Sequence, residues 1–128
     1  MAEGSGLAFV PMGSFGRRVW HGAASVAERL GDHHRAVADG ATAARRTLMR
    51  LRDWAARARD ATAAIKGDNA ARIIAALMAR PLASTEAVEQ AAAISRGTAE
   101  RLLARMAGMG LVREVTGTRR FRLWTAAT

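Results

Sequence analysis

Apolar residues recur at spacings of three and four through the middle of the chain, a pattern typical of an amphipathic helix. The pattern predicts one helix over residues 40–66, with a heptad stripe on one face. Thr62 is the polar member of the stripe, and its hydroxyl can bond to a carbonyl one turn earlier and so be buried. The stripe consists of Ala41, Ala44, Leu48, Leu51, Ala55, Ala58, Thr62 and Ile65.

This stripe has two interpretations. It can pack on the chain's own domain, or it can pair with the same helix of a second copy. Because the stripe is longer than one small domain needs, we expect a homodimer formed through residues 40–66. The other faces of the helix are basic and carry Arg45, Arg46, Arg50, Arg52, Arg57 and Arg59.

The N-terminal part of the chain has weaker patterns. Residues 1–16 contain four glycines and one proline, and we expect a flexible arm there. Residues 17–31, "RRVWHGAASVAERLG", suit a short helix that ends at Gly31. Residues 32–40, "DHHRAVADG", would then link it to the longer helix, so that 17–67 forms a helical region.

The C-terminal half predicts three helices, over 69–80, 85–92 and 95–109. Pro81 ends the first helix, because the residue before a proline disfavours helical backbone. Ser84 and Ser95 are the N-caps of the second and third helices, and Gly110 ends the third. The residues expected to face the core are Ile73, Ile74, Leu77 and Met78 in the first helix and Ala99, Leu102, Leu103 and Met106 in the third.

A β-hairpin is expected after these helices. Strands over 112–115 and 120–124 would be joined across residues 116–119, where Gly117 lies between two threonines. Three helices followed by a hairpin is the order of a winged helix-turn-helix domain. We therefore expect a mainly α fold, with a winged helix-turn-helix domain over 68–128 preceded by one or two N-terminal helices.

In that architecture the helix after the tight turn enters the major groove, and the hairpin, or wing, contacts the DNA backbone. Arginine pairs with guanine edges, and threonine contacts a thymine methyl or a phosphate. The expected DNA-binding residues of the helix are Ser95, Arg96, Gly97, Thr98, Glu100, Arg101 and Arg105, and those of the wing are Thr118, Arg119, Arg120 and Arg122.

The net charge of +9 and the sequence pI near 11.8 favour a polyanionic partner. Residues 95–128 carry seven arginines against two glutamates, so the excess is concentrated in the predicted DNA-binding segment. An ordinary solvated basic face is the simpler interpretation of the same residues. Nineteen of the twenty basic residues are arginine, which reflects codon bias and does not explain the excess of bases over acids.

Other chemistry is poorly represented. The chain has no cysteine, which excludes disulfides and thiolate metal sites. His33 and His34 are adjacent and would point apart on a helix, so they cannot easily bind one metal ion together. His21 and Asp32 are further possible ligands, but the set remains a poor metal site. No catalytic constellation, cofactor motif, membrane span or signal pattern is present, and the alanine-rich 40–66 helix buries too little hydrocarbon to hold a bilayer. We expect a cytoplasmic binding protein without a cofactor or metal.

The segment "STEAVEQAAAISRGTAERLLARMAGMGLVREVTGTRRFRLW" resembles the C-terminal winged helix-turn-helix domain of bacterial Fic-family proteins and of uncharacterised bacterial helix-turn-helix proteins. The resemblance covers about residues 69–125 and is most specific over 111–117. It implies the fold and DNA binding. The sequence departs from the family at Gly97, where proline is common, and at Ala93, where glycine is common. A left-handed alanine at Ala93 would cost about 1 kcal/mol.

The Fic catalytic motif is absent, so the resemblance implies no adenylyltransferase activity. The sequence therefore predicts a sequence-specific double-stranded DNA-binding protein that regulates transcription. Two alternatives stay open. In the first, the domain would be a protein-interaction winged helix that does not bind DNA. In the second, the chain would be a truncated C-terminal fragment of a larger Fic-like or related protein.

Overall fold

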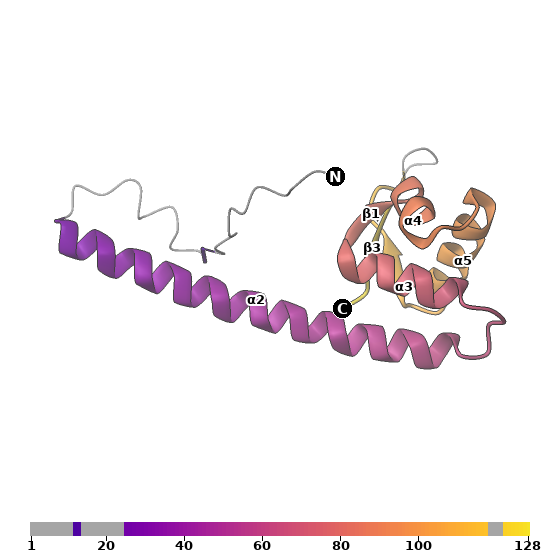
Figure 1. Ribbon diagram of the computed structural model, residues 1–128, viewed down its shortest axis with the longest axis horizontal. Helices are drawn as coiled ribbons and strands as arrows, with labels where there is room; N and C mark the ends of the chain where they lie inside the picture. The colour runs from indigo at the N-terminus through magenta and orange to yellow at the C-terminus, as the bar shows by residue number, and fades with distance from the viewer. Residues whose placement is uncertain (1–11, 14–24, 118–121) are drawn as a thin grey trace. The chain divides into compact units, whose positions relative to one another are not determined.

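The computed structural model describes residues 12–13, 25–117 and 122–128 of the chain. By its internal contacts the chain divides into two units, at the boundary between Leu48 and Met49, and the second unit is Met49–Thr128. The described elements are α2 (Val26–Thr62), α3 (Asn69–Ala79), β1 (Leu82–Ser84), α4 (Thr85–Ala92), α5 (Arg96–Gly108), β2 (Val112–Glu114) and β3 (Leu123–Ala126) (Figure 1). The fold is thus mainly helical with one small sheet.

Helix α2 differs from the sequence prediction at both ends. It begins at Val26, so Gly31 does not end a helix and residues 32–40 are helical rather than a linker. Ser25 starts the helix through a capping box: its backbone N and its Oγ both donate to Glu28 Oε2, at 2.8 Å and 2.7 Å. A glycine inside a helix costs about 1 kcal/mol, which weakens the helix at Gly31 without ending it.

The C-terminal end of α2 comes at Thr62, four residues before the expected end. Ala63 N and Ile65 N donate to the carbonyls of Asp60 and Thr62, which are three-residue turns rather than α-helical bonds. Thr62 itself agrees with the prediction, because its Oγ1 donates to Ala58 O at 2.7 Å and the side chain is buried. The chain then reverses toward α3 through Gly67, which adopts a φ of +82°.

The three helices predicted in the C-terminal half are confirmed within one residue at each end. Arg80, before Pro81, is extended, with φ −136° and ψ 92°. Ser84 Oγ accepts from Ala87 N and Ser95 Oγ accepts from Thr98 N, so both caps are confirmed. The expected core residues of α3 and α5 are buried, apart from Met78, which is half-buried against the core.

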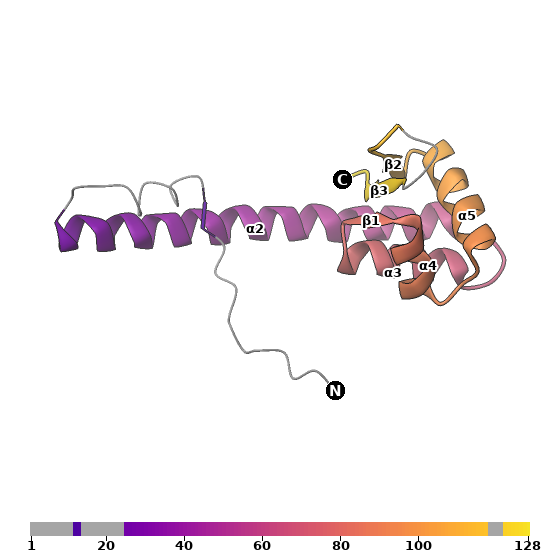
Figure 2. The same cartoon turned by 90° about the horizontal axis from the view of Figure 1, so that it is seen from above.

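The sheet is larger than the predicted hairpin. β1 had no signal in the sequence, yet it pairs antiparallel with β3, and the strand order is β1-β3-β2 (Figure 2). β2 ends one residue earlier than expected, and the second strand is shifted from 120–124 to Leu123–Ala126. Trp124 and Ala126 alternate inward along β3, so burial of these two side chains determines its position.

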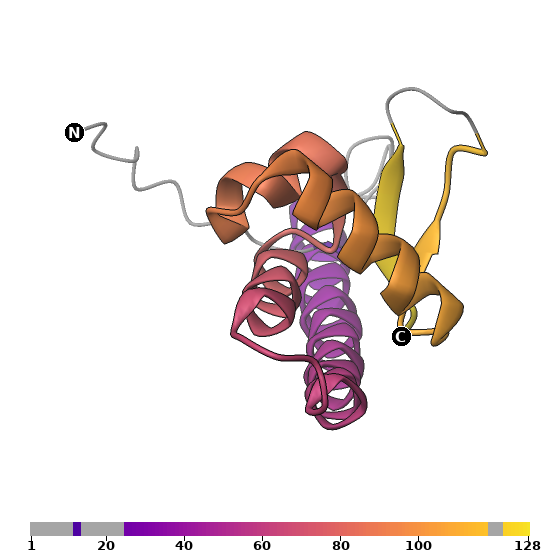
Figure 3. The ribbon, with the colours of Figure 1, turned by 90° about the vertical axis from the view of Figure 1, so that its right-hand side faces the viewer.

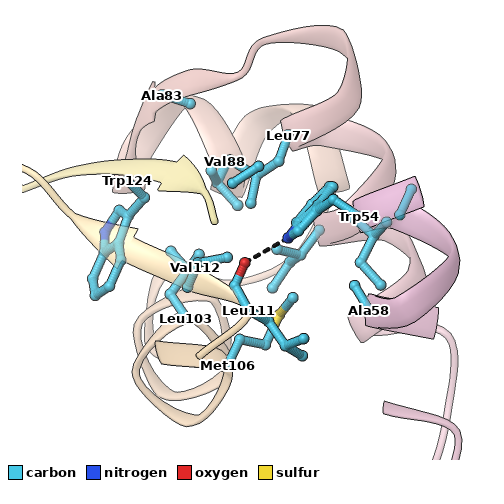
Figure 4. Close-up of a cluster of buried hydrophobic side chains, with 14 of the residues drawn as sticks. Trp54, Ala58, Leu77, Ala83, Val88, Leu103, Met106, Leu111, Val112 and Trp124 are labelled. Atoms are coloured by element: carbon cyan, nitrogen blue, oxygen red, sulfur yellow. Dashed lines mark hydrogen bonds between the residues drawn. The ribbon is translucent and has the colours of Figure 1, made fainter. Parts of the chain in front are cut away.

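The core of the Met49–Thr128 unit includes the last turns of α2 (Figure 4). Leu51, Trp54, Ala55 and Ala58 are buried together with residues of α3, α4, α5 and the sheet. The compact unit therefore begins within α2 rather than at residue 68. Trp54 and Trp124 are both buried in this core.

Candidate nucleic-acid interface

The turn between α4 and α5 is tight and strained at one residue. Ala93 has φ 50° and ψ 49°, the left-handed conformation that glycine adopts without cost. Its N–H donates to Gln90 O, and Ile94 N donates to Glu89 O at 3.2 Å. These bonds close α4 and place Ile94 against the core, so that α5 can begin immediately after Ser95.

Helix α5 presents one face to the core and the opposite face to solvent. Ala99, Leu102, Leu103 and Met106 are buried, whereas Gly97, Arg101, Ala104 and Gly108 form the opposite row at spacings of four and three. A Cβ added to Gly97 or Gly108 would meet nothing within 4 Å. This face is therefore shallow, with Arg101 as its one long side chain and Arg105 exposed at its edge.

Arg96 and Glu100 form an ion pair on the first turns of α5. Arg96 Nε donates to Glu100 Oε1 at 3.0 Å, and the side chains are 74% and 56% exposed. The hydrogen bond to Glu100 raises the pKa of Arg96, and the charges of Glu100, Glu89 and Glu86 act in the same direction. Arg96 therefore stays charged, and Glu100 partly balances its charge before any ligand binds.

The charges around the start of α5 are balanced rather than purely basic. Glu86 and Glu89 lie on α4, which packs against α5, and they join Glu100 near Arg96. The sequence prediction did not include Glu86 or Glu89. The sequence nevertheless shows that Glu86 and Glu89 are three residues apart, and this spacing places both side chains on one face of a helix. Among the described residues, neither Arg101 nor Arg105 forms an ion pair.

The stem of the predicted wing is formed by β2 and β3, which lie beside α5 (Figure 3). Val115 N donates to Leu123 O at 2.8 Å, and Leu123 N donates to Thr116 Oγ1 at 3.2 Å, so the pairing continues beyond β2. Arg122 and Glu114 form an ion pair, with 3.7 Å between Arg122 Nε and Glu114 Oε2. Arg113 is exposed on β2.

The structure therefore brings together part of the predicted site. Ser95 caps α5, Thr98 supports the cap through a 2.9 Å contact between the two hydroxyls, and the charged side chains of α5 are exposed around them. Arg122 is present but paired. Thr118, Arg119 and Arg120 lie outside the described residues.

Other kinds of site find no support in the described part of the chain. It holds no group of three or more His, Cys, Asp or Glu side chains that could bind a metal. His33 and His34 are exposed on α2, with ring centroids 6.3 Å apart. No helix among the described residues has the length and apolar character needed to cross a membrane.

Comparison of the chain with protein-family models, with curated proteins and with solved structures found no match.

Proposed function

We propose that this protein is a cytoplasmic, sequence-specific double-stranded DNA-binding protein that regulates transcription, and that residues 68–128 form a winged helix-turn-helix. The observation that carries the proposal is the exposed face of α5. A helix that follows a tight turn exposes Arg101 opposite its buried residues and Arg105 at the edge of that face, and the other residues of the face, Gly97, Ala104 and Gly108, are small. A shallow face of this kind suits close approach to the major groove.

The sheet supports the same assignment. β2 and β3 run antiparallel directly after α5, and β1 pairs with β3 from the other side. The chain between β2 and β3 contains Arg119 and Arg120. We assign these arginines and Arg113 to the phosphate backbone, where charge contributes affinity and little sequence preference.

The proposed homodimer requires a revised interface. Leu51, Ala55, Ala58 and Thr62 of the stripe are buried within the Met49–Thr128 unit and cannot also pair with a second copy. Leu48 is 60% exposed, and Val26 and Leu30 are exposed nearer the start of α2. We therefore assign dimerisation to the part of α2 before Leu51, which would let two domains bind two half-sites.

A salt titration of the full-length chain on random duplex DNA tests the proposal. Because phosphate contacts release counterions, the binding constant should fall steeply and linearly with salt on a double logarithmic scale. On random duplex, binding is almost entirely to phosphates, so Arg101 and Arg105 of α5 neutralise phosphates there. Arg101→Ala/Arg105→Ala should therefore reduce the slope by about 2, at roughly one unit for each phosphate that is no longer neutralised. The control is Arg57→Ala, an exposed arginine of α2 outside the proposed interface, which should leave the slope unchanged. Binding that is independent of salt, or equal in wild type and the double variant, contradicts DNA binding by α5.

The second candidate function is a protein-interaction module. It is favoured by the acidic side chains of Glu86, Glu89 and Glu100 around the start of α5, which repel phosphates. Such a module would bind no duplex DNA above background at low salt. The same titration therefore separates the two functions.

A further inference from the structure

The ion pair on the first turns of α5 leaves specific atoms free. Arg96 uses Nε for its bond to Glu100 Oε1. Among the described residues, no hydrogen bond engages the two terminal Nη nitrogens of Arg96 or the Oε2 atom of Glu100. The pair therefore presents two donor nitrogens and one acceptor on the exposed side of the helix start.

These three groups match one edge of one base pair. In the major groove, guanine presents N7 and O6 as acceptors, and cytosine presents its N4 amino group as a donor. No other base pair in this orientation places two adjacent acceptors next to a donor. An adenine in place of guanine would put its N6 amino group against the Nη donors, and the thymine opposite would put O4 against the carboxylate.

We infer that Arg96 and Glu100 together read a single guanine–cytosine base pair. The Nη donors of Arg96 bind guanine O6 and N7, and Glu100 Oε2 accepts from cytosine N4. This inference rests on the proposed function and adds to it the base pair and the reason for a glutamate at this position. Glu100 acts both by contacting cytosine and by holding the guanidinium plane of Arg96 in place, which reduces the rotamer freedom lost on binding.

The same carboxylate weakens binding to every other sequence. Glu100 adds a negative charge close to the phosphates, and Glu86 and Glu89 of α4 add two more. At a site without the matching base pair, this repulsion is not compensated by a contact to cytosine. The pair therefore gains discrimination by lowering non-specific affinity.

Selection from a pool of random duplexes tests the inference, with full-length wild type, Glu100→Ala, Arg96→Ala and the double variant. Wild type should enrich one G·C pair, with about a tenfold preference over the other pairs, which is within the range for a bidentate base contact. Arg96→Ala should abolish that preference, and Glu100→Ala should reduce it at the same base pair, because the contact to cytosine N4 and the restraint on Arg96 are lost while the Nη donors remain. The double variant should lose no more than Arg96→Ala alone. Glu100→Ala should also bind random duplex more tightly than wild type.

The matched control is Glu86→Ala, which removes one exposed negative charge near Arg96 without removing a hydrogen bond to it. It should raise binding to random duplex and keep the G·C preference. Glu100→Gln retains one acceptor and the side-chain shape, and it should show an intermediate preference.

The outcomes separate the inference from the function on which it rests. The inference is overturned if Glu100→Ala keeps the wild-type preference at every position, or flattens a different base pair from Arg96→Ala. It is also overturned if wild type binds DNA with salt dependence but enriches no G·C pair. Wild type that binds no duplex overturns the proposed function, and the inference falls with it.

Discussion

Trp54 Nε1 donates a hydrogen bond of 2.6 Å to the carbonyl oxygen of Leu111, 57 residues later in the chain (Figure 4). Trp54 lies on α2 and is fully buried, and Leu111 lies between α5 and β2. The bond satisfies the indole N–H inside the core, where an unpaired donor would be costly. It connects the last turns of α2 to the point where α5 leads into the predicted wing.

Trp54→Phe should lower the free energy of unfolding by about 2–3 kcal/mol, because it removes a buried hydrogen bond and leaves a cavity. Trp124→Phe is the matched comparison. Trp124 Nε1 donates to the Thr85 hydroxyl at 3.0 Å, and this hydrogen bond is only part-buried. After Trp124→Phe, the Thr85 hydroxyl can bond to water instead, so the loss of unfolding free energy should be smaller. Urea unfolding followed by circular dichroism measures both. An equal or smaller loss for Trp54→Phe contradicts this role for the bond to Leu111.

Ala93→Gly should raise the free energy of unfolding by about 0.5–1 kcal/mol, because it relieves left-handed strain at this turn. The backbone there has φ 50°, and the entropy that the unfolded chain gains from glycine offsets only part of the relief. Ala104→Gly is the control, because Ala104 is exposed in the interior of α5 and the same change there should cost about 1 kcal/mol. Thermal unfolding of both variants should give shifts of opposite sign. A decrease for Ala93→Gly argues against strain at this turn.

Leu48→Glu should convert the proposed dimer to monomers without unfolding the Met49–Thr128 unit. Leu48 is 60% exposed and Leu51 is 6% exposed, so only a substitution at Leu51 places a carboxylate in the core. Leu51→Glu should therefore destabilise the unit by several kcal/mol, on the order of 3, whatever the oligomeric state. Sedimentation equilibrium at micromolar concentration measures the mass. A wild-type mass near 13.6 kDa would rule out the dimer.

The start of α2 should lose helix at acidic pH. Hydrogen bonds from Ser25 lower the pKa of Glu28 in the folded protein, so the capping box contributes stability above the unfolded pKa. That contribution disappears as the pH falls through the lowered folded pKa, because the protonated carboxyl is a weaker acceptor. The protection of residues 25–29 against amide exchange, taken relative to the intrinsic exchange rate at each pH, should fall in this window. Glu28→Gln should remove the pH dependence, and an unchanged profile in that variant contradicts the assignment.

Local signals in the sequence are sufficient for the C-terminal helices. Pro81, Ser84, Ser95 and Gly110 act on backbone within a few residues, so their effect does not depend on the rest of the fold. The start of α2 carries the same kind of signal, because Ser25 and Glu28 have the spacing of a capping box. The expected helix end at Gly31 is wrong because a glycine weakens a helix without requiring it to stop.

The candidate site on α5 can also be located from the pattern of residues alone, because the 3.6-residue period separates Leu102, Leu103 and Met106 from Arg101 and Arg105. Three other features emerge only when the chain is folded: the packing partner of the α2 stripe, the addition of β1 to the sheet, and the position of the α4 glutamates near Arg96. Each of these depends on contacts between residues far apart in the chain. Such contacts follow from which apolar surfaces can be buried together, and no local pattern of residues specifies that.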